Sequence, residues 1–267
     1  MTGETDPRFA TTLARGLSVL RSIRSIDDGL SNAELAARTG LPKSTVSRLT
    51  WTLCQLGYLT QSVRDERFRP GPTLVAVGHV AAGSMAFMSQ AEELMADLAN
   101  QTGTLAVLAV RDIDRLTVVR TWRPLQLHSM WMAVGHRLPL SQRSSSRAFA
   151  AALTDPEYAQ VLAQIDSIGS TGFLQDERLA AQQDLRQQGF VTNFTTGAPT
   201  TTYLSVSVPF RPAELNEPVV FTCGALPADV SVDHMLDTVG PRLRAAVNRL
   251  ERLTGHPPGP ADEEAWT

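Results

Sequence analysis

Two short helical patterns separated by a turn constrain the fold of this chain more than any other feature. Ser31 is followed three residues later by Glu34, a pair whose side chains satisfy each other's free backbone N–H groups at a helix start. The helix that begins there stops at Gly40, because glycine tolerates the left-handed backbone that ends a helix. Pro42 then suits the first turn of another helix, since it has no N–H to lose. The pattern predicts a capped helix, a short turn and a second helix.

The flanking segments complete a larger unit. A helix over residues 9–26 is predicted by one apolar face, formed by Phe9, Leu13, Leu17, Leu20 and Ile23. The helix after Pro42 extends to about residue 56 and ends at Gly57. Residues 58–60 and 67–69 are predicted as two short strands joined by a hairpin. Helix, capped helix, turn, helix and hairpin is the order of a winged helix-turn-helix, which we assign to residues 9–70.

The charge is distributed unevenly along the chain. The whole sequence of 267 residues has a net charge of −3, which by itself argues against a nucleic-acid partner. Residues 1–70 hold ten Lys or Arg and seven Asp or Glu, a net charge of +3, so the remainder carries −6. A basic module attached to an acidic body is expected when only one end of a protein meets phosphate.

The third helix carries the side chains suited to DNA. A recognition helix places polar side chains against base edges while its opposite face packs on the domain. Its predicted polar face consists of Lys43, Ser44, Thr45, Ser47 and Arg48. Arg48 has the geometry to pair with guanine O6 and N7. Further cations suited to phosphate or to the minor groove are Arg64, Arg67 and Arg69 on the hairpin and Arg8 on the N-terminal arm. A generic three-helix module that binds protein or nothing is the alternative interpretation.

Beyond the hairpin, three further parts are expected. Residues 71–90 form a linker helix, with a seam suited to packing either against a second copy or on its own domain, made of Leu74, Gly78, Ala81, Met85 and Met88. Residues 91–255 are mixed α and β, and residues 256–267 form a disordered tail rich in proline and acid. Strands are expected at 105–110, 116–121, 127–134, 203–210 and 219–225. Helices are expected at 92–100, 144–153, 156–165, 177–188 and 232–253.

Several function classes lack their motifs. The sequence contains no nucleophile elbow, P-loop or dinucleotide-binding glycine motif. Its five histidines are scattered, so no metal site is expected, and no cofactor is expected either. No apolar run approaches the length of a membrane helix, and the first ten residues lack the apolar core of a secretory signal. Two cysteines make no disulfide framework, so a cytoplasmic setting is the simplest expectation.

The sequence resembles the IclR family of bacterial transcriptional regulators over nearly its whole length. The most specific similarities are residues 15–20, residues 35–49, the segment Leu56-Gly57-Tyr58-Leu59 and the exit Phe68-Arg69-Pro70-Gly71-Pro72. The resemblance implies an α+β protein, with a GAF-like (profilin-like) α/β domain after the winged helix and the linker. It also implies a homodimer, or a dimer of dimers, on a palindromic operator in double-stranded DNA.

The resemblance further implies a small-molecule effector, often an organic or aromatic acid, in the C-terminal domain. Residues of this chain that fall on the walls of that pocket are Arg143, Ser145, Ser146, Asn193, Ser205 and Cys223. Met130 and Met132 are expected to add an apolar wall. Several of these depart from the usual family residues, since Asn193 stands where Asp is frequent and Ser144–Ser146 replace small apolar residues and glycine. Arg143 and the serine hydroxyls near a helix start favour a carboxylate.

Three hypotheses follow. The leading one is a DNA-binding regulator, by preference a repressor, whose operator binding responds to an effector. The second keeps DNA binding but makes residues 91–255 an assembly domain that binds no ligand. The third is an enzyme with a winged-helix appendage, which the missing catalytic motifs disfavour.

Overall fold

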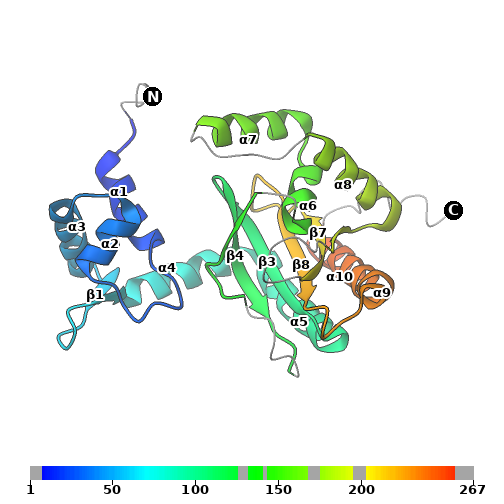
Figure 1. The fold of residues 1–267 in the computed structure, drawn as a ribbon, viewed down its shortest axis with the longest axis horizontal. Coiled ribbons are helices and arrows are strands. Elements are labelled where there is room, and N and C mark those ends of the chain that lie inside the picture. The colour runs from blue at the N-terminus through cyan, green and yellow to red at the C-terminus, as the bar shows by residue number, and fades with distance from the viewer. Residues whose placement is uncertain (1–7, 126–131, 141–142, 168–174, 195–202, 256–267) are drawn as a thin grey trace. The chain divides into compact units, whose positions relative to one another are not determined.

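The chain folds into two compact units, residues 1–84 and residues 85–267. The computed structural model describes residues 8–125, 132–140, 143–167, 175–194 and 203–255 (Figure 1). Each unit has a hydrophobic core of its own.

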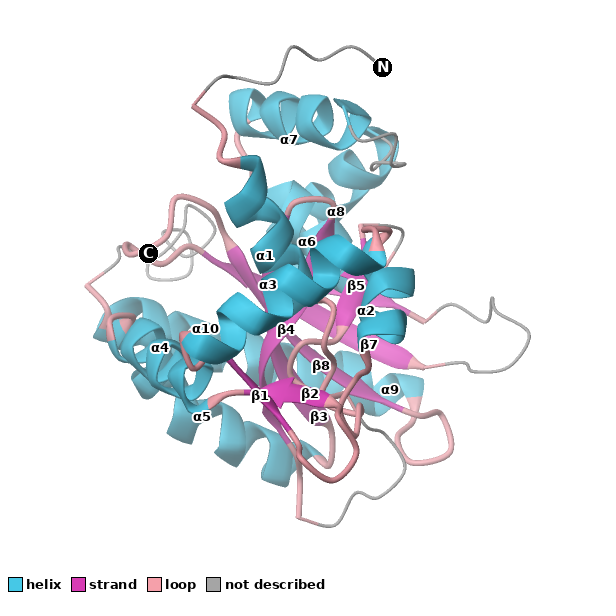
Figure 2. Ribbon diagram, turned by 90° about the vertical axis from the view of Figure 1, so that its left-hand side faces the viewer, coloured by secondary structure: helices cyan, strands magenta, loops and turns pink. Residues whose placement is uncertain are grey.

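The N-terminal unit is a three-helix module with a hairpin and a fourth helix. Its elements are α1 (Thr11–Arg21), α2 (Asn32–Thr39), α3 (Lys43–Gln55), β1 (Leu59–Gln61), β2 (Phe68–Pro70) and α4 (Pro72–Gly83). Ser31 and Glu34 form the predicted capping box, and Gly40 ends α2 in the left-handed conformation at φ +69°. β1 and β2 pair as a short antiparallel wing (Figure 2). The core consists of Val19, Leu30, Leu35, Val46, Leu59 and Phe68.

α1 buries a different face from the predicted one. Gly16 and Val19 are its buried residues, while Leu20 only partly packs on the core. Phe9, Leu13 and Leu17 are 56%, 63% and 49% exposed. The apolar spacing correctly indicated a helix, and Ile23 of the predicted face also packs on the core, but the other three residues are about half exposed or more.

The C-terminal unit is built on a six-stranded sheet. Its helices are α5 (Ala86–Thr102), α6 (Ser144–Ala152), α7 (Asp155–Ser167), α8 (Gln175–Gln188), α9 (Val232–His234), the π-helix η1 (Met235–Val239) and α10 (Gly240–Leu253). Its strands are β3 (Leu105–Asp112), β4 (Arg115–Trp122), β5 (Arg137–Pro139), β6 (Val191–Asn193), β7 (Leu204–Phe210) and β8 (Val219–Ala225). The strands lie in the order β5-β4-β3-β8-β7-β6, and all neighbours are antiparallel.

Helices cover both faces of this sheet (Figure 1). α6 packs on β6, β7 and β8, and α8 packs on β6 and α6. α5 and α10 pack against the opposite face, where Phe87, Phe210, Phe221 and Trp122 form a chain of ring contacts. Successive side chains of a strand point to opposite faces. Each strand therefore contributes one set of residues to the α6 side and another to the α5 side.

Three predicted elements differ from the structure. The helix expected from residue 74 to 88 breaks at Ser84 and Met85, where Met85 adopts an extended backbone. Met88 then packs in the C-terminal unit, so the predicted seam does not continue through it. The closing helix expected over 232–253 contains the π-helix η1 just before Pro241, which lacks an N–H for the regular ladder. Of the strand expected at 127–134, residues 127–131 lie outside the described residues and 132–134 form no strand, whereas β5 was not predicted.

Candidate DNA-binding surface and effector cavity

α3 presents a polar row on its outer face. Val46 and Thr50 are buried beneath it, and the Thr50 hydroxyl donates to the Val46 carbonyl at 3.0 Å. Lys43, Ser44, Ser47 and Arg48 are exposed, and Thr45 is half-buried. The sequence prediction therefore placed all five polar residues on the accessible side of the helix.

The cations of this row are not neutralised. Within the part of the chain that the structure describes, the side chains of Lys43 and Arg48 have no hydrogen bond, ion pair or ring contact. The same holds for the Arg64 side chain at the tip of the wing. Three positive charges thus remain available for an external anion.

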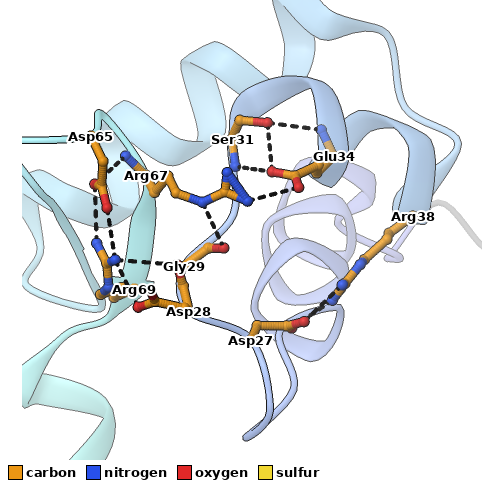
Figure 3. Close-up of polar contacts among 9 residues, drawn as sticks. All are labelled: Asp27, Asp28, Gly29, Ser31, Glu34, Arg38, Asp65, Arg67 and Arg69. Carbon is orange, nitrogen blue, oxygen red and sulfur yellow. Dashed lines mark hydrogen bonds and ion pairs between the residues drawn. The ribbon is translucent and has the colours of Figure 1, made fainter.

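Two other wing arginines are held inside the unit (Figure 3). Arg67 Nη2 lies 2.8 Å from Glu34 Oε1, and its Nε donates to the Gly29 carbonyl at 3.1 Å. Arg69 Nη2 lies 2.9 Å from Asp28 Oδ1 and 2.8 Å from Asp65 Oδ2. Hydrogen bonds from Arg69 hold the pKa of Asp65 far below its usual range. The arginines therefore tie the wing to the turn before α2.

The same turn is shaped to receive these arginines. Gly29 has φ +75°, and a Cβ placed there would lie 2.9 Å from Arg67 Cβ. Only glycine fits such a position without strain. On the other side of the turn, Arg38 donates to both Asp27 carboxylate oxygens, at 2.6 and 2.8 Å. These hydrogen bonds lower the pKa of Asp27.

The remaining predicted cation, Arg8 on the N-terminal arm, lies just before α1 and is exposed.

A cavity opens beside α6 in the C-terminal unit. Its apolar lining comes from Leu105, Val107, Met132 and Leu138, and its polar lining from Arg143, Ser144, Ser145, Tyr203, Ser205 and Thr222. Its volume is about 30 Å³, room for about two water molecules. The cavity is therefore small in this conformation.

The polar wall of the cavity is a chain of hydroxyl groups. Ser144 Oγ lies 2.7 Å from Ser205 Oγ and 2.8 Å from Ser207 Oγ. Ser207 Oγ in turn lies 2.8 Å from Thr222 Oγ1. These groups satisfy one another. Ser145 is 3% exposed, lines the cavity, and its hydroxyl has no partner among the described residues.

Arg143 brings a positive charge to the lining of the cavity. It occupies the N-cap position of α6, and no side chain caps the free N–H groups of that helix start. Its guanidinium lies 5.2 Å from the centre of the Tyr203 ring, a favourable cation–π contact. No carboxylate of the described residues pairs with it. Burial lowers the pKa of Arg143, since desolvation disfavours the charged form. An anion in the cavity would offset that cost.

Apart from Cys223, the predicted effector residues fall into three groups. Met132, Arg143, Ser145 and Ser205 line the cavity. Ser146 and Asn193 do not: the Ser146 hydroxyl donates to the Pro139 carbonyl at 3.1 Å, and Asn193 lies half-buried on the edge strand β6. Met130 lies outside the described residues.

Cys223 requires a correction. Thr222 and Gly224 line the cavity, so the residue between them points to the other face of the sheet. Cys223 is fully buried there beside Thr104, and burial raises the pKa of its thiol to about 12. It therefore faces away from the cavity.

The sequence analysis missed two cavity-lining residues, Tyr203 and Thr222. The alternation of serines along residues 205–207 could have indicated a polar face on β7.

The described residues offer neither a metal site nor a single membrane-spanning helix. No group of three or more His, Cys, Asp or Glu is arranged to hold a metal ion there. No single helix there is long and apolar enough to span a membrane, although α4 and α5 taken together, as a bent pair, reach the required length and composition.

The fold and the exposed row on α3 define a winged helix-turn-helix DNA-binding protein with a separate cavity-bearing domain. Two family descriptions match this chain, the IclR helix-turn-helix domain over residues 12–62 and the bacterial transcriptional regulator IclR C-terminal domain over residues 79–211. The chain belongs to the IclR family of transcriptional regulators, which are DNA-binding regulators and not enzymes.

Known proteins of this family resemble the chain to different extents. The Pca regulon regulatory protein of Pseudomonas putida is 30% identical over 189 residues, which cover 69% of this chain and 64% of that protein. An IclR family regulator from Brucella abortus is similar in structure, with a TM-score of 0.71, 28% identity and coverage of 95% of this chain and 96% of that one. An IclR homologue from Microbacterium hydrocarbonoxydans, solved with 4-hydroxybenzoate, shares the fold at 16% identity and a TM-score of 0.66, covering 89% and 99% of the two chains.

Proposed function

We propose that the protein is a sequence-specific regulator that binds a palindromic operator as a homodimer, or as a dimer of dimers. The observation that carries this proposal is the polar row on α3, where Lys43 and Arg48 have no side-chain partner within the part of the chain that the structure describes. In the proposed complex α3 lies in the major groove, and Ser44, Thr45, Ser47 and Arg48 face base edges or phosphates. Lys43, Arg8 and Arg64 contact the backbone of the DNA. The protein would act in the cytoplasm, where the bacterial chromosome lies.

Pairing of two copies is supported by apolar surface on the N-terminal unit. α4 has no buried residue, and its Val75, Val77 and Val80 are 59%, 49% and 74% exposed. Leu13 and Leu17 of α1 are further exposed apolar residues of the same unit. Apolar patches of this kind mark interaction sites. A second copy would cover them and set two recognition helices at a fixed spacing.

We further propose that a small organic acid in the α6 cavity modulates operator binding. Arg143 and Ser145 support this proposal, because an anion would pair with the guanidinium and accept from the free hydroxyl and the α6 N–H groups. The homologue solved with 4-hydroxybenzoate shows that a protein of this fold can bind an aromatic acid. An acid of that size would require Met132, Arg143 and Tyr203 to move, since the cavity holds about 30 Å³.

The small cavity also favours a second candidate function. In that alternative the C-terminal unit only assembles the oligomer, and the hydroxyl groups of the chain serve only to satisfy one another's hydrogen bonds in the core.

Repression is the proposed sign of control, because it requires only occupancy of the operator, whereas activation needs an additional contact with RNA polymerase.

Two experiments test these proposals. Selection of bound fragments from genomic DNA should recover a palindromic sequence, and recovery of no preferred sequence would contradict operator binding. Thermal-shift measurements with acetate, lactate, benzoate and 4-hydroxybenzoate should find an acid that stabilises the wild type but not Arg143→Gln. A panel without any shift would favour the assembly-only alternative.

A further inference from the structure

Trp51 lies on α3 one turn beyond Arg48, the last residue of the polar row, and its side chain is exposed. Trp51 is 66% exposed, although tryptophan is a residue type that is buried in most folded proteins. Its indole has no hydrogen bond and no ring contact among the described residues. The predicted polar face of α3 did not include it. Tryptophan is enriched at binding interfaces, where its large ring supplies contact area, so an indole exposed on this face of α3 is a candidate contact residue.

Helix geometry places Trp51 on the same line as the proposed base-reading residues. At about 100° per residue, Ser47, Arg48 and Trp51 lie within roughly 60° of the direction of Ser44. Val46, Leu49 and Leu53, which form or pack against the core, lie on the opposite side. Trp51 is about 10 Å along the helix axis from Ser44, the rise of seven residues and close to three base-pair steps. The indole therefore belongs to the row that meets the ligand.

We propose that Trp51 is a specificity-determining residue that contacts thymine C5 methyl groups in the major groove. The thymine methyl is the apolar feature of the major-groove edge, and apolar side chains read it. The charge of the neighbouring residues favours DNA over protein as the occupant, because Lys43 and Arg48, which have no side-chain partner among the described residues, precede Trp51 on the same helix. The inference rests on the proposed placement of α3 in the major groove.

The contact would add selectivity that the hydroxyl residues of α3 do not provide. Ser and Thr hydroxyls bond to either donors or acceptors, so they discriminate weakly between bases. An indole discriminates by shape, since it gains contact area from the thymine methyl and none from cytosine. Burial of one methyl group against the ring is worth about fourfold in affinity, the ratio that corresponds to about 0.8 kcal/mol.

The test removes the methyl groups and the indole separately and together. Duplexes selected from genomic DNA by the wild-type protein are prepared with thymine or with uracil, which lacks only the methyl group. Equilibrium dissociation constants are measured for wild type and Trp51→Ala on both duplexes. The wild type should lose about fourfold in affinity per contacted thymine on the uracil duplex. Trp51→Ala should bind the two duplexes equally well.

Two further variants separate the possible failures. Leu56→Ala removes an apolar side chain that is 59% exposed at the end of α3 but lies off the row, and it should respond to uracil as the wild type does. Arg48→Ala tests the placement of α3 itself. If Arg48→Ala weakens binding while Trp51→Ala keeps the full uracil effect, the inference about Trp51 is overturned and the placement of α3 stands. If neither substitution affects DNA binding, both fail.

A second copy of the chain is the competing partner for Trp51. Sedimentation analysis of Trp51→Ala without DNA decides this point. An unchanged oligomeric state supports the DNA contact. Dissociation of the oligomer together with an unaltered uracil effect would assign Trp51 to a protein interface and overturn the proposal.

Discussion

Arg48 and Lys43 carry charges that no carboxylate of the described residues neutralises. Arg38, Arg67 and Arg69 of the same unit are each paired with an acid. The net charge of +3 of residues 1–70 therefore hides a division of roles. The paired arginines hold the module together, whereas Lys43 and Arg48 have no side-chain partner among the described residues. This division depends on contacts between segments far apart in sequence. Arg69 and Asp28, for example, are 41 residues apart.

Substitution of Arg48 by alanine should weaken operator binding by roughly 1–3 kcal/mol and relax the preference at one base pair. The reason is that a bidentate guanidinium distinguishes guanine from the other bases. Lys43→Ala should instead weaken binding about equally on all sequences. Fluorescence anisotropy with the selected operator and single-base variants measures both effects. Equal losses on every duplex for Arg48→Ala would make it a phosphate contact.

Single residues also show where sequence reasoning stops. The pattern of α2 and α3, with Ser31, Glu34, Gly40 and Pro42, was sufficient to locate the recognition helix, because capping is local. The error at Cys223 has a different origin. Whether a strand residue faces the cavity depends on the register and on which helix covers which face, and neither is local information.

The wing is an element whose cations divide between two roles. Arg64 at its tip has no side-chain partner among the residues that the structure describes, whereas Arg67 and Arg69 hold the strands against the turn before α2. In a plot of log affinity against log salt, Arg64→Ala should reduce the slope by about one per protomer. Arg67→Ala should leave the slope nearly unchanged and lower the melting temperature. A loss of slope for Arg67→Ala as large as that for Arg64→Ala would show that Arg67 leaves Glu34 for phosphate.

The start of α7 gives a pH-dependent prediction. Glu157 accepts from Arg211 Nη1 and Nη2 at 2.9 Å, and these bonds hold the pKa of its carboxyl at about 2. The folded pKa is lower than the unfolded one, so the ionised carboxylate stabilises the folded state above about pH 4.5. This contribution is lost as the pH falls toward 2. Glu157→Gln should therefore lose less stability than the wild type between pH 5 and 2 in urea denaturation. Parallel pH curves would contradict the ion pair.

Elements were predicted well where periodicity and caps agreed. Helices α6, α7 and α8 and strands β7 and β8 begin and end close to their predicted bounds. The break between α4 and α5 was missed because the apolar spacing continues across it, while Phe87 and Met88 are recruited by the core of the other unit. Tertiary packing overrode a local pattern there. The three-residue β5 gives too short a pattern to detect.

At the scale of the whole molecule, the exposed valines of α4 predict an assembly. Val77→Glu should raise the dissociation constant of the dimer at least about tenfold, because an unpaired carboxylate buried in an interface costs several kcal/mol. Operator affinity should fall with it, since a single copy has few cations. Sedimentation equilibrium measures the change. Val232→Glu, an exposed valine of α9, serves as the control. A Val77→Glu protein that remains a dimer would place the interface elsewhere.

Control of DNA binding by an acid requires that the cavity of the C-terminal unit and the α3 helix of the N-terminal unit be energetically coupled. Coupling between two binding sites is reciprocal and commonly changes affinity by about 5- to 150-fold. The direct test is the operator dissociation constant with and without a saturating concentration of the acid found by thermal shift, for wild type and Arg143→Gln. The wild type should change its operator affinity at least about fivefold, and Arg143→Gln should not respond. An acid that binds the wild type yet leaves its operator affinity unchanged would contradict control of DNA binding by the cavity.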